Sequence, residues 1–270
     1  LQSKESIFRA ACVQLNTGNN LDNNIADAIK SIRKAADLGA DFVALPENSV
    51  FMSKNSEDAK ANALFEDNHP AVSAFSDVAA ELKIWILAGT ISIQLKNGLL
   101  ANRAFVFNAK GEIVAKYDKI HMFDAKLAEN QQYFESKIFQ PGDSAVALDL
   151  PWLKLGLTIC YDVRFPYLYR SLAHAGAGLI AVPSAFTYLT GKDHWHSLLR
   201  ARAIENACYI IAPAQCGKHP GNRRTYGHSM VISPWGEIIS EAGNMPGIID
   251  VEIDDCSVFT WFWLSRCWHC

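Results

Sequence analysis

Apolar residues recur along the first part of the chain with two periods, and the change between them predicts a strand, a helix and a second strand. Residues 7–15 form a mostly apolar run of strand length. Across residues 21–36 the apolar side chains fall at helical spacing, and Gly39 follows where a helix commonly ends. Residues 41–45 are again apolar and predict the second strand.

The same alternation continues along the rest of the chain. Further helices and strands are predicted, the helices at 69–82, 167–174 and 193–207 and the strands at 84–93, 153–160, 178–183 and 209–214. Two hairpins are predicted, from residues 103–108 with 112–120 and from 227–233 with 237–240. Residues 123–143 are rich in polar side chains and predict a loop. This order favours an α/β fold whose mixed sheets are covered by helices over a purely parallel doubly wound sheet.

The composition fits one large folded domain. Half of the 270 residues are hydrophobic and a fifth are charged, and no stretch rich in proline, glycine and serine marks a linker. The formal net charge is -3, and no run of lysine and arginine forms a basic stripe. Nucleic acid and an anionic membrane surface are therefore not expected as partners.

Cysteine usage and the N-terminal residues favour the cytoplasm. Seven scattered cysteines do not resemble the disulfide framework of a small secreted protein. The first apolar run is short and is interrupted by Arg9, so it fits neither a signal peptide nor a membrane span of ~20 apolar residues.

Three polar side chains stand at or just beyond the ends of predicted strands: Glu47, Lys119 and Cys160. Strand ends gather at one edge of a layered α/β protein, where a carboxylate could serve as base for a thiol and a lysine could stabilise negative charge. On composition and spacing alone, a purely structural role for these three residues is at least as well supported as a catalytic one. In the structural interpretation Glu47 caps a helix, Lys119 is a solvated strand-end charge and Cys160 is a small core residue.

The short sequence segments around these residues are more informative than the spacing between them. Residues 45–48 (Leu-Pro-Glu-Asn), 116–124 (Lys-Tyr-Asp-Lys-Ile-His-Met-Phe-Asp) and 156–166 (Gly-Leu-Thr-Ile-Cys-Tyr-Asp-Val-Arg-Phe-Pro) resemble the catalytic segments of the nitrilase, or carbon–nitrogen hydrolase, superfamily. The resemblance extends from about residue 8 to residue 254. It implies a four-layer α-β-β-α sandwich with two mixed sheets covered by outer helices.

The resemblance also implies roles for particular residues. Glu47 would be the base, Lys119 the stabiliser of charge and Cys160 the nucleophile, while Glu135 resembles a second glutamate that the family places beside the lysine. The backbone N–H of Tyr161 would help Lys119 to hold the oxyanion, and no metal or organic cofactor is required.

Within the superfamily the sequence is most similar to the Nit branch, which contains ω-amidases and deaminated-glutathione amidases. This implies hydrolysis of the terminal amide of small dicarboxylic acid monoamides, giving an acid and ammonia through a thioester. The alternatives are nitrile or N-carbamoyl hydrolysis and a catalytically silent binding or scaffold protein. Tyr161, Ser184 and His194 are the predicted substrate contacts, and the wider set of candidates for the distal carboxylate is Arg164, Ser184, Thr187, Tyr188 and His194.

Two features depart from the family pattern. Tyr167 stands where the family usually has a glutamate, and His196 replaces a common acidic residue. Residues 1–254 are expected to form a single carbon–nitrogen hydrolase domain, followed by an atypical tail at 255–270 that is rich in tryptophan and cysteine. The aromatic side chains of the tail are expected to cover apolar surface rather than to build a metal site, which favours a homodimer or higher homo-oligomer.

Overall fold

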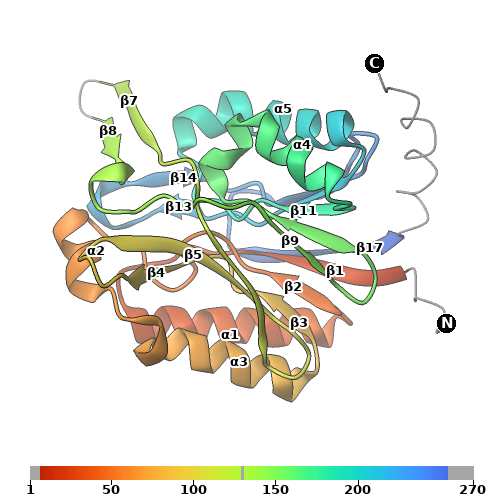
Figure 1. Cartoon of the computed structure of the whole chain (residues 1–270), viewed down its shortest axis with the longest axis horizontal. Coiled ribbons are helices and arrows are strands. Elements are labelled where there is room, and N and C mark those ends of the chain that lie inside the picture. Colours follow the sequence, from red (N-terminus) through yellow and green to blue (C-terminus); the bar gives the residue numbers. More distant parts are fainter. Residues whose placement is uncertain (1–6, 129–130, 255–270) are drawn as a thin grey trace.

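The computed structural model describes residues 7–128 and 131–254. Two β-sheets lie face to face and helices cover their outer sides, which gives the four layers α-β-β-α visible in Figure 1. On one outer side lie α1 (Leu21–Asp37) and α3 (Pro70–Leu82), and on the other lie α4 (Pro166–His174) and α5 (Tyr188–Asn206). The predicted fold class is confirmed.

The first sheet has seven strands and joins the two ends of the domain. Its order is β17 (Gly247–Asp254), β1 (Ile7–Gln14), β2 (Phe42–Ala44), β3 (Trp85–Leu87), β5 (Leu100–Phe107) and β4 (Ile91–Gln94), with β6 (Ile113–Asp118) also paired to β5. The first three strands after β17 run parallel, and the other pairs are antiparallel. The pairing of β17 with β1, from Ile7↔Asp254 to Gln14↔Gly247, closes the domain.

The second sheet is also mixed. Its six strands follow the order β16 (Ile238–Glu241), β15 (Met230–Ile232), β12 (Tyr209–Ala212), β11 (Leu179–Ala181), β10 (Lys154–Leu157) and β9 (Val146–Asp149). The central strands β10, β11 and β12 are parallel. The carboxyl ends of β2 and β10, which precede Glu47 and Cys160, supply two of the polar residues singled out above.

Apolar side chains fill the spaces between the layers. Between the sheets, Phe8 of β1 stacks on Trp152, with ring centroids 4.5 Å apart. Between the first sheet and its helices, α1 supplies Ile32 and α3 supplies Phe75 to a second fully buried cluster. Burial of each such side chain contributes roughly 1.5–3 kcal/mol, so packing on both faces holds the sheets rigid.

The strand predicted at residues 84–93 is wrong in one respect, because it is divided into β3 and β4 at Gly89. Gly89 has a φ of +66°, and a Cβ atom there would lie 1.9 Å from the carbonyl oxygen of Pro46. Only glycine allows the chain to turn this close to Pro46. The break therefore presses the β3–β4 turn against the segment that carries Glu47.

The predicted loop at residues 123–143 is also wrong in part, since it contains β7 (Asp124–Ala128), β8 (Gln131–Phe134) and a short 3-10 helix η2 (Glu135–Lys137). Helix α5 begins at Tyr188, five residues before the predicted start of 193. The β7–β8 hairpin pairs its strands with each other rather than with a large sheet, so its polar residues are compatible with strand structure.

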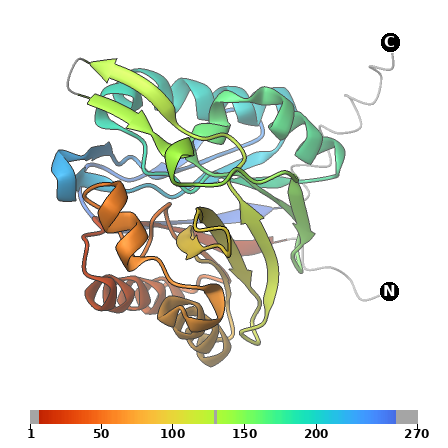
Figure 2. The ribbon, with the colours of Figure 1, turned by 60° about the vertical axis from the view of Figure 1, so that its left-hand side comes forward.

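Three small elements lie at the same end of the molecule in both views of the ribbon (Figures 1 and 2). They are the β7–β8 hairpin, helix α2 (Ser56–Asn62), and the hairpin of β13 (Cys216–Lys218) and β14 (Arg224–Tyr226). Neither α2 nor this second hairpin was predicted, because each is too short for a clear periodic pattern. Together they surround the opening described in the next subsection. Throughout the part of the chain that the structure describes, every helix is too short or too polar to cross a membrane.

His69 caps helix α3 and gives the fold a predictable response to acid. Its Nδ1 accepts a hydrogen bond from the Ala71 N–H at 3.2 Å, and burial lowers the pKa of this histidine from 6.5 to about 4. The unfolded chain therefore binds a proton near pH 6.5 that the folded chain does not bind until about pH 4. The contribution of neutral His69 to the free energy of unfolding is therefore fully present above pH 6.5 and is lost as the pH drops from 6.5 to 4.

We expect this proton to lower the free energy of unfolding by up to about 3 kcal/mol over that interval. His69→Asn keeps a capping acceptor but does not titrate, so this variant should lose less stability between pH 7 and pH 4.5 than the wild type does. Chemical denaturation at the two pH values measures the difference. Equal losses in the two proteins would contradict this assignment to His69.

Candidate active site

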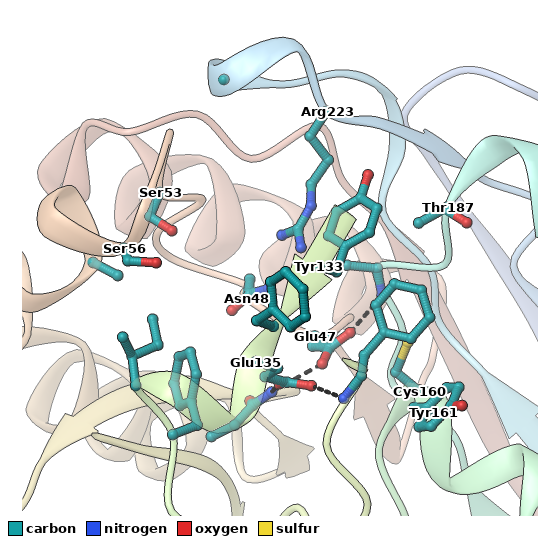
Figure 3. A pocket seen from close by; sticks show the side chains of 18 of the residues that line it. Glu47, Asn48, Ser53, Ser56, Tyr133, Glu135, Cys160, Tyr161, Thr187 and Arg223 are labelled. Carbon is teal, nitrogen blue, oxygen red and sulfur yellow. Dashed lines mark hydrogen bonds between the residues drawn. The ribbon is translucent and has the colours of Figure 1, made fainter. Parts of the chain in front are cut away.

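Four charged or reactive side chains from separate parts of the sequence meet in one cavity of about 640 Å³ (Figure 3). Glu47 follows β2, Lys119 follows β6, and Cys160 begins the short 3-10 helix η3 (Cys160–Arg164) after β10. Glu135 comes from η2, which follows the β7–β8 hairpin. The structure thus brings together all four residues to which the family resemblance gave catalytic roles.

Lys119 lies between the two glutamates. Its Nζ is 3.0 Å from Glu47 Oε1 and 2.9 Å from Glu135 Oε2, and its side chain is only 2% exposed. A buried ammonium requires such partners, because the loss of hydration would otherwise drive off its proton. Burial alone would lower the pKa of Lys119, but the charges of Glu135 and Glu47 outweigh it and raise that pKa well above its usual value.

Glu47 is held in a fixed position by three groups. Its Oε1 accepts hydrogen bonds from Lys119 and from Asn102 Nδ2, the latter at 2.9 Å, and its Oε2 accepts one from the Ala185 N–H at 2.8 Å. Burial and the charge of Glu47 in turn raise the pKa of the Cys160 thiol. Burial raises the pKa of Glu47, but the charge of Lys119 and these hydrogen bonds together lower it below its usual value. Glu47 is therefore a carboxylate at neutral pH.

Cys160 keeps its proton in the resting site. Burial and the nearby charge of Glu47 raise the pKa of its thiol well above the usual value, although Lys119 acts in the opposite direction. The resting pair is thus a thiol beside a carboxylate rather than a thiolate. This arrangement suits a base that removes the thiol proton only when an electrophile arrives.

The backbone at Cys160 is held in an uncommon conformation. Its φ is +47°, which is rare for a residue other than glycine, and its N–H donates to the carbonyl oxygen of Pro183 at 2.9 Å. Asp162 fixes the next turn: it is fully buried and accepts hydrogen bonds from the Tyr117 hydroxyl at 2.7 Å and from the Ile159 N–H at 2.8 Å. Such strain persists only where surrounding contacts enforce it, and here it aims the sulfur into the cavity.

Asn102 on β5 is a site residue that the sequence did not reveal. Its side-chain Nδ2 donates to Glu47 Oε1 at 2.9 Å and to Glu135 Oε1 at 3.2 Å, and its backbone carbonyl oxygen accepts from the backbone N–H of Lys119 at 3.0 Å. The side-chain amide of Asn102 therefore ties both carboxylates to β5, and the backbone of the same residue fixes the start of the segment that carries Lys119. Asn102 stands beside Arg103 in an otherwise apolar strand, where its residue type gives no signal of its purpose.

Of the three predicted substrate contacts, one lines the cavity and two do not. Tyr161 lines the cavity, and its ring packs edge-on against Phe123 with centroids 5.0 Å apart. Ser184 is fully buried, and its hydroxyl donates to the Val182 carbonyl oxygen at 2.9 Å. His194 is exposed on α5, and its Nδ1 lies 3.1 Å from the Arg164 guanidinium. The structure does not place Ser184 or His194 in the cavity lining, so their side chains have no direct route to a substrate there.

The remaining candidates for the distal carboxylate are divided in the same way. Arg164 and Thr187 line the cavity, whereas Tyr188 packs outside it against Tyr226. Tyr167 is the most exposed large apolar side chain of the described residues, at 85%. The predicted role of the tail falls on residues 255–270, outside the described part of the chain.

His194 and His196 point away from each other, as their spacing on a helix predicts. His196 Nε2 lies 3.0 Å from Glu241 Oε1, and His228 Nδ1 lies 2.6 Å from the same oxygen. Burial raises the pKa of Glu241, but its bonds with His228 and His196 outweigh burial and lower it. These three residues could hold a metal ion by their proximity alone, but they are outside the lining of the cavity that contains Cys160.

The arrangement of Glu47, Lys119, Glu135 and Cys160 can be compared with known proteins. The profile of the family described as Carbon-nitrogen hydrolase matches residues 9–260. The chain belongs to the carbon-nitrogen hydrolase family. Its four-layer fold and the sequence motifs around the cavity agree with this membership, and the protein is accordingly a hydrolase of carbon–nitrogen bonds in linear amides.

Three similar proteins illustrate the relation within this carbon-nitrogen hydrolase family. A Synechocystis protein named deaminated glutathione amidase is 40% identical over 252 residues, which cover 92% of each chain. The crystal structure of the C. elegans NitFhit protein matches with a TM-score of 0.89 and 33% identity, over 97% of this chain and 64% of that longer one. A mutant amidase from Nesterenkonia sp. AN1, with acrylamide added at its active site cysteine, has a TM-score of 0.81 and 25% identity, covering 97% of this chain and 99% of that one. The predicted similarity to the Nit branch is confirmed.

Proposed function

We propose that this hydrolase is a cysteine amidase that cleaves the terminal amide of small dicarboxylic acid monoamides through a thioester on Cys160. The observation that carries the proposal is the meeting of Cys160, Glu47 and Lys119 in one cavity, where burial and the charge of Glu47 raise the pKa of the Cys160 thiol. A thiol needs a base to become a nucleophile at neutral pH, and Glu47 is the carboxylate whose charge acts on this thiol.

In the proposed acylation step, Glu47 takes the thiol proton while the sulfur forms a bond to the amide carbon. The carbonyl oxygen becomes an oxyanion, which Lys119 and the N–H of Tyr161 stabilise. The carbon–nitrogen bond then breaks as Glu47 passes its proton to the departing nitrogen. The products of this step are a free amine or ammonia and an acyl thioester on Cys160.

In the proposed deacylation step, Glu47 removes a proton from water, and the hydroxide oxygen attacks the thioester carbon. The sulfur–carbon bond breaks, and the sulfur recovers its proton from Glu47. Lys119 and Glu135 keep their charges through both steps, because each is paired with the other at 2.9 Å. Glu135 thus positions Lys119 and requires no proton transfer of its own.

The substrate class follows from the relatives. Deaminated glutathione is the substrate in the name of the Synechocystis protein, and we extend this class to the present chain. In glutathione the γ-carboxyl group is linked to cysteinylglycine, so hydrolysis at that amide releases the dipeptide, whereas a primary amide releases ammonia. The ammonia product expected from the sequence therefore applies to primary amides, and an assay must follow the acid product.

A substrate panel tests this proposal. We expect hydrolysis of deaminated glutathione, α-ketoglutaramate and α-ketosuccinamate, and much slower hydrolysis of an aliphatic nitrile or an N-carbamoyl amino acid. Formation of each carboxylic acid can be followed by chromatography. Faster turnover of the nitrile or the carbamoyl compound would replace the proposed reaction by one of those alternatives, and turnover of none would favour a silent binding protein.

We also propose that the protein acts in the cytoplasm and as a homo-oligomer. A reducing compartment would keep Cys160 a free thiol. Large apolar side chains are exposed at Tyr167 and Ile204, and a second copy could cover them. Sedimentation of the full chain as a monomer would contradict the second point.

A further inference from the structure

Arg223 reaches the cavity through the turn between β13 and β14. Gly221 in this turn has a φ of +71°, and a Cβ atom there would lie 2.1 Å from the carbonyl oxygen of Lys54. The turn is therefore pressed against the segment that leads into α2. Asn222 also has a positive φ, of 59°, so the chain reverses sharply and Arg223 extends toward the cavity (Figure 3).

Four cationic residues line this cavity: Lys54, Lys119, Arg164 and Arg223. Lys119 is occupied by its two glutamates. Arg164 is drawn to one side, where its guanidinium lies 3.1 Å from His194 and within 6 Å of two aromatic rings. Lys54 is exposed at the rim.

Arg223 differs from Lys119, whose partners are carboxylates, and from Arg164, whose Nη2 is engaged by a histidine nitrogen. The Nη1 of Arg223 lies 3.1 Å from the Met52 sulfur, and its guanidinium carbon lies 5.6 Å from the centre of the Tyr133 ring. Within residues 7–128 and 131–254, no carboxylate lies within ion-pair distance of this half-buried cation. A methionine and an aromatic ring hold the side chain in place, while the hydrogen-bond donors that do not face Met52 stay available.

The two ends of the cavity therefore carry opposite charge. Glu47 and Glu135 stand at the reacting end, where they would repel a carboxylate of the substrate, and Arg223 offers a planar pair of donors elsewhere on the wall. A substrate with an amide at one end and a carboxylate at the other would be oriented by this difference. Its amide would face Cys160 and its carboxylate would face Arg223.

We propose that Arg223 is the specificity residue that binds the distal carboxylate on the acyl chain of the substrate. This inference rests on the proposed amidase function and adds the chemical reason for a preference for dicarboxylic acid monoamides. Arginine binds a carboxylate through two parallel hydrogen bonds, and the ring of Tyr133 keeps the guanidinium plane in position.

The test compares Arg223→Gln with Arg224→Gln. Arg224 is the adjacent arginine, but it is exposed and stacks on Tyr188 at 3.6 Å outside the cavity lining, so its loss is a matched control. The substrates are glutaramate and pentanamide, which have the same chain length but differ in the carboxylate. We expect Arg223→Gln to lower kcat/KM for glutaramate about 10- to 100-fold, mostly through KM, and to leave pentanamide unchanged. Arg224→Gln should change neither.

Arg223→Lys should recover only part of the loss, because an ammonium keeps the charge but not the paired donors. Equal losses on glutaramate and pentanamide would overturn the inference, and so would a loss confined to amides whose carboxylate lies on the departing amine. Binding of glutaramate to Cys160→Ala, with and without Arg223→Gln, tests the inference by calorimetry without turnover. Weaker binding in the double variant supports the role of Arg223 even if the wild type hydrolyses neither amide, and equal binding contradicts it.

Discussion

Replacing Cys160 by alanine abolishes amide hydrolysis and leaves the fold intact. The proposed pathway has no covalent intermediate without the sulfur, so kcat should fall by at least about 10⁴-fold. Stability should change little, because the side chain loses one sulfur atom at the wall of a cavity and Glu47 keeps its bonds to Lys119, Asn102 and Ala185. Acid formation from α-ketoglutaramate and a thermal melt measure the two effects.

Cys208→Ala is the matched control. Cys208 is also a buried free thiol, and burial raises its pKa to about 12, but it lies outside the cavity lining. Its replacement should lower stability slightly and leave turnover unchanged. Appreciable activity in Cys160→Ala, or an equal loss in Cys208→Ala, would argue against Cys160 as the nucleophile.

Glu47→Gln should remove most of the activity while keeping the size of the side chain. The amide oxygen can still accept from the Ala185 N–H, but it cannot take the thiol proton or receive one from water. General base catalysis contributes typically 10²–10⁴-fold, so we expect kcat to fall by about 10³-fold. The loss should appear in the first turnover, because the acylation step needs the same base.

Glu66→Gln provides the comparison for this second variant. Glu66 is a partly buried carboxylate that pairs with Arg103 at 2.7 Å and with Lys116, away from the Cys160 cavity. Losing it should weaken an ion-pair network without slowing hydrolysis. Rapid-quench measurement of the first turnover separates the two cases. A first turnover in Glu47→Gln that is as fast as in the wild type would contradict the role of Glu47 as base.

The layered fold could be predicted because its long elements are strongly periodic. Helix α1 is an example: apolar residues face one side, the Asn20 side chain accepts from the Asn23 N–H at its start, and Gly39 follows its end with a φ of +88°. The division at Gly89 could not be predicted, because it depends on the approach of Pro46, which lies in the segment after β2. A single sequence carries no record of such a long-range contact.

In the candidate site, too, the residues marked by their local sequence could be predicted, and those that depend on distant contacts could not. Glu47, Lys119 and Cys160 could be found because each stands in a distinctive short segment that resembles a catalytic segment of the carbon–nitrogen hydrolase family. Asn102 and Arg223 could not, since neither has an informative neighbourhood and both gain their roles from residues more than 30 positions away. Ser184 lies in such a familiar segment, but its hydroxyl turns to the backbone of Val182, which only the folded chain reveals.

The thioester on Cys160 is the central claim, and mass spectrometry of the full chain tests it most directly. The wild type would be mixed with a dicarboxylic acid monoamide, quenched in acid during the first turnovers and digested. We predict that the acyl group is found on the peptide that contains Cys160 and is absent from the same peptide of Cys160→Ala. An acyl group on another residue, or product formed with no acylated peptide at any quench time, would contradict the account.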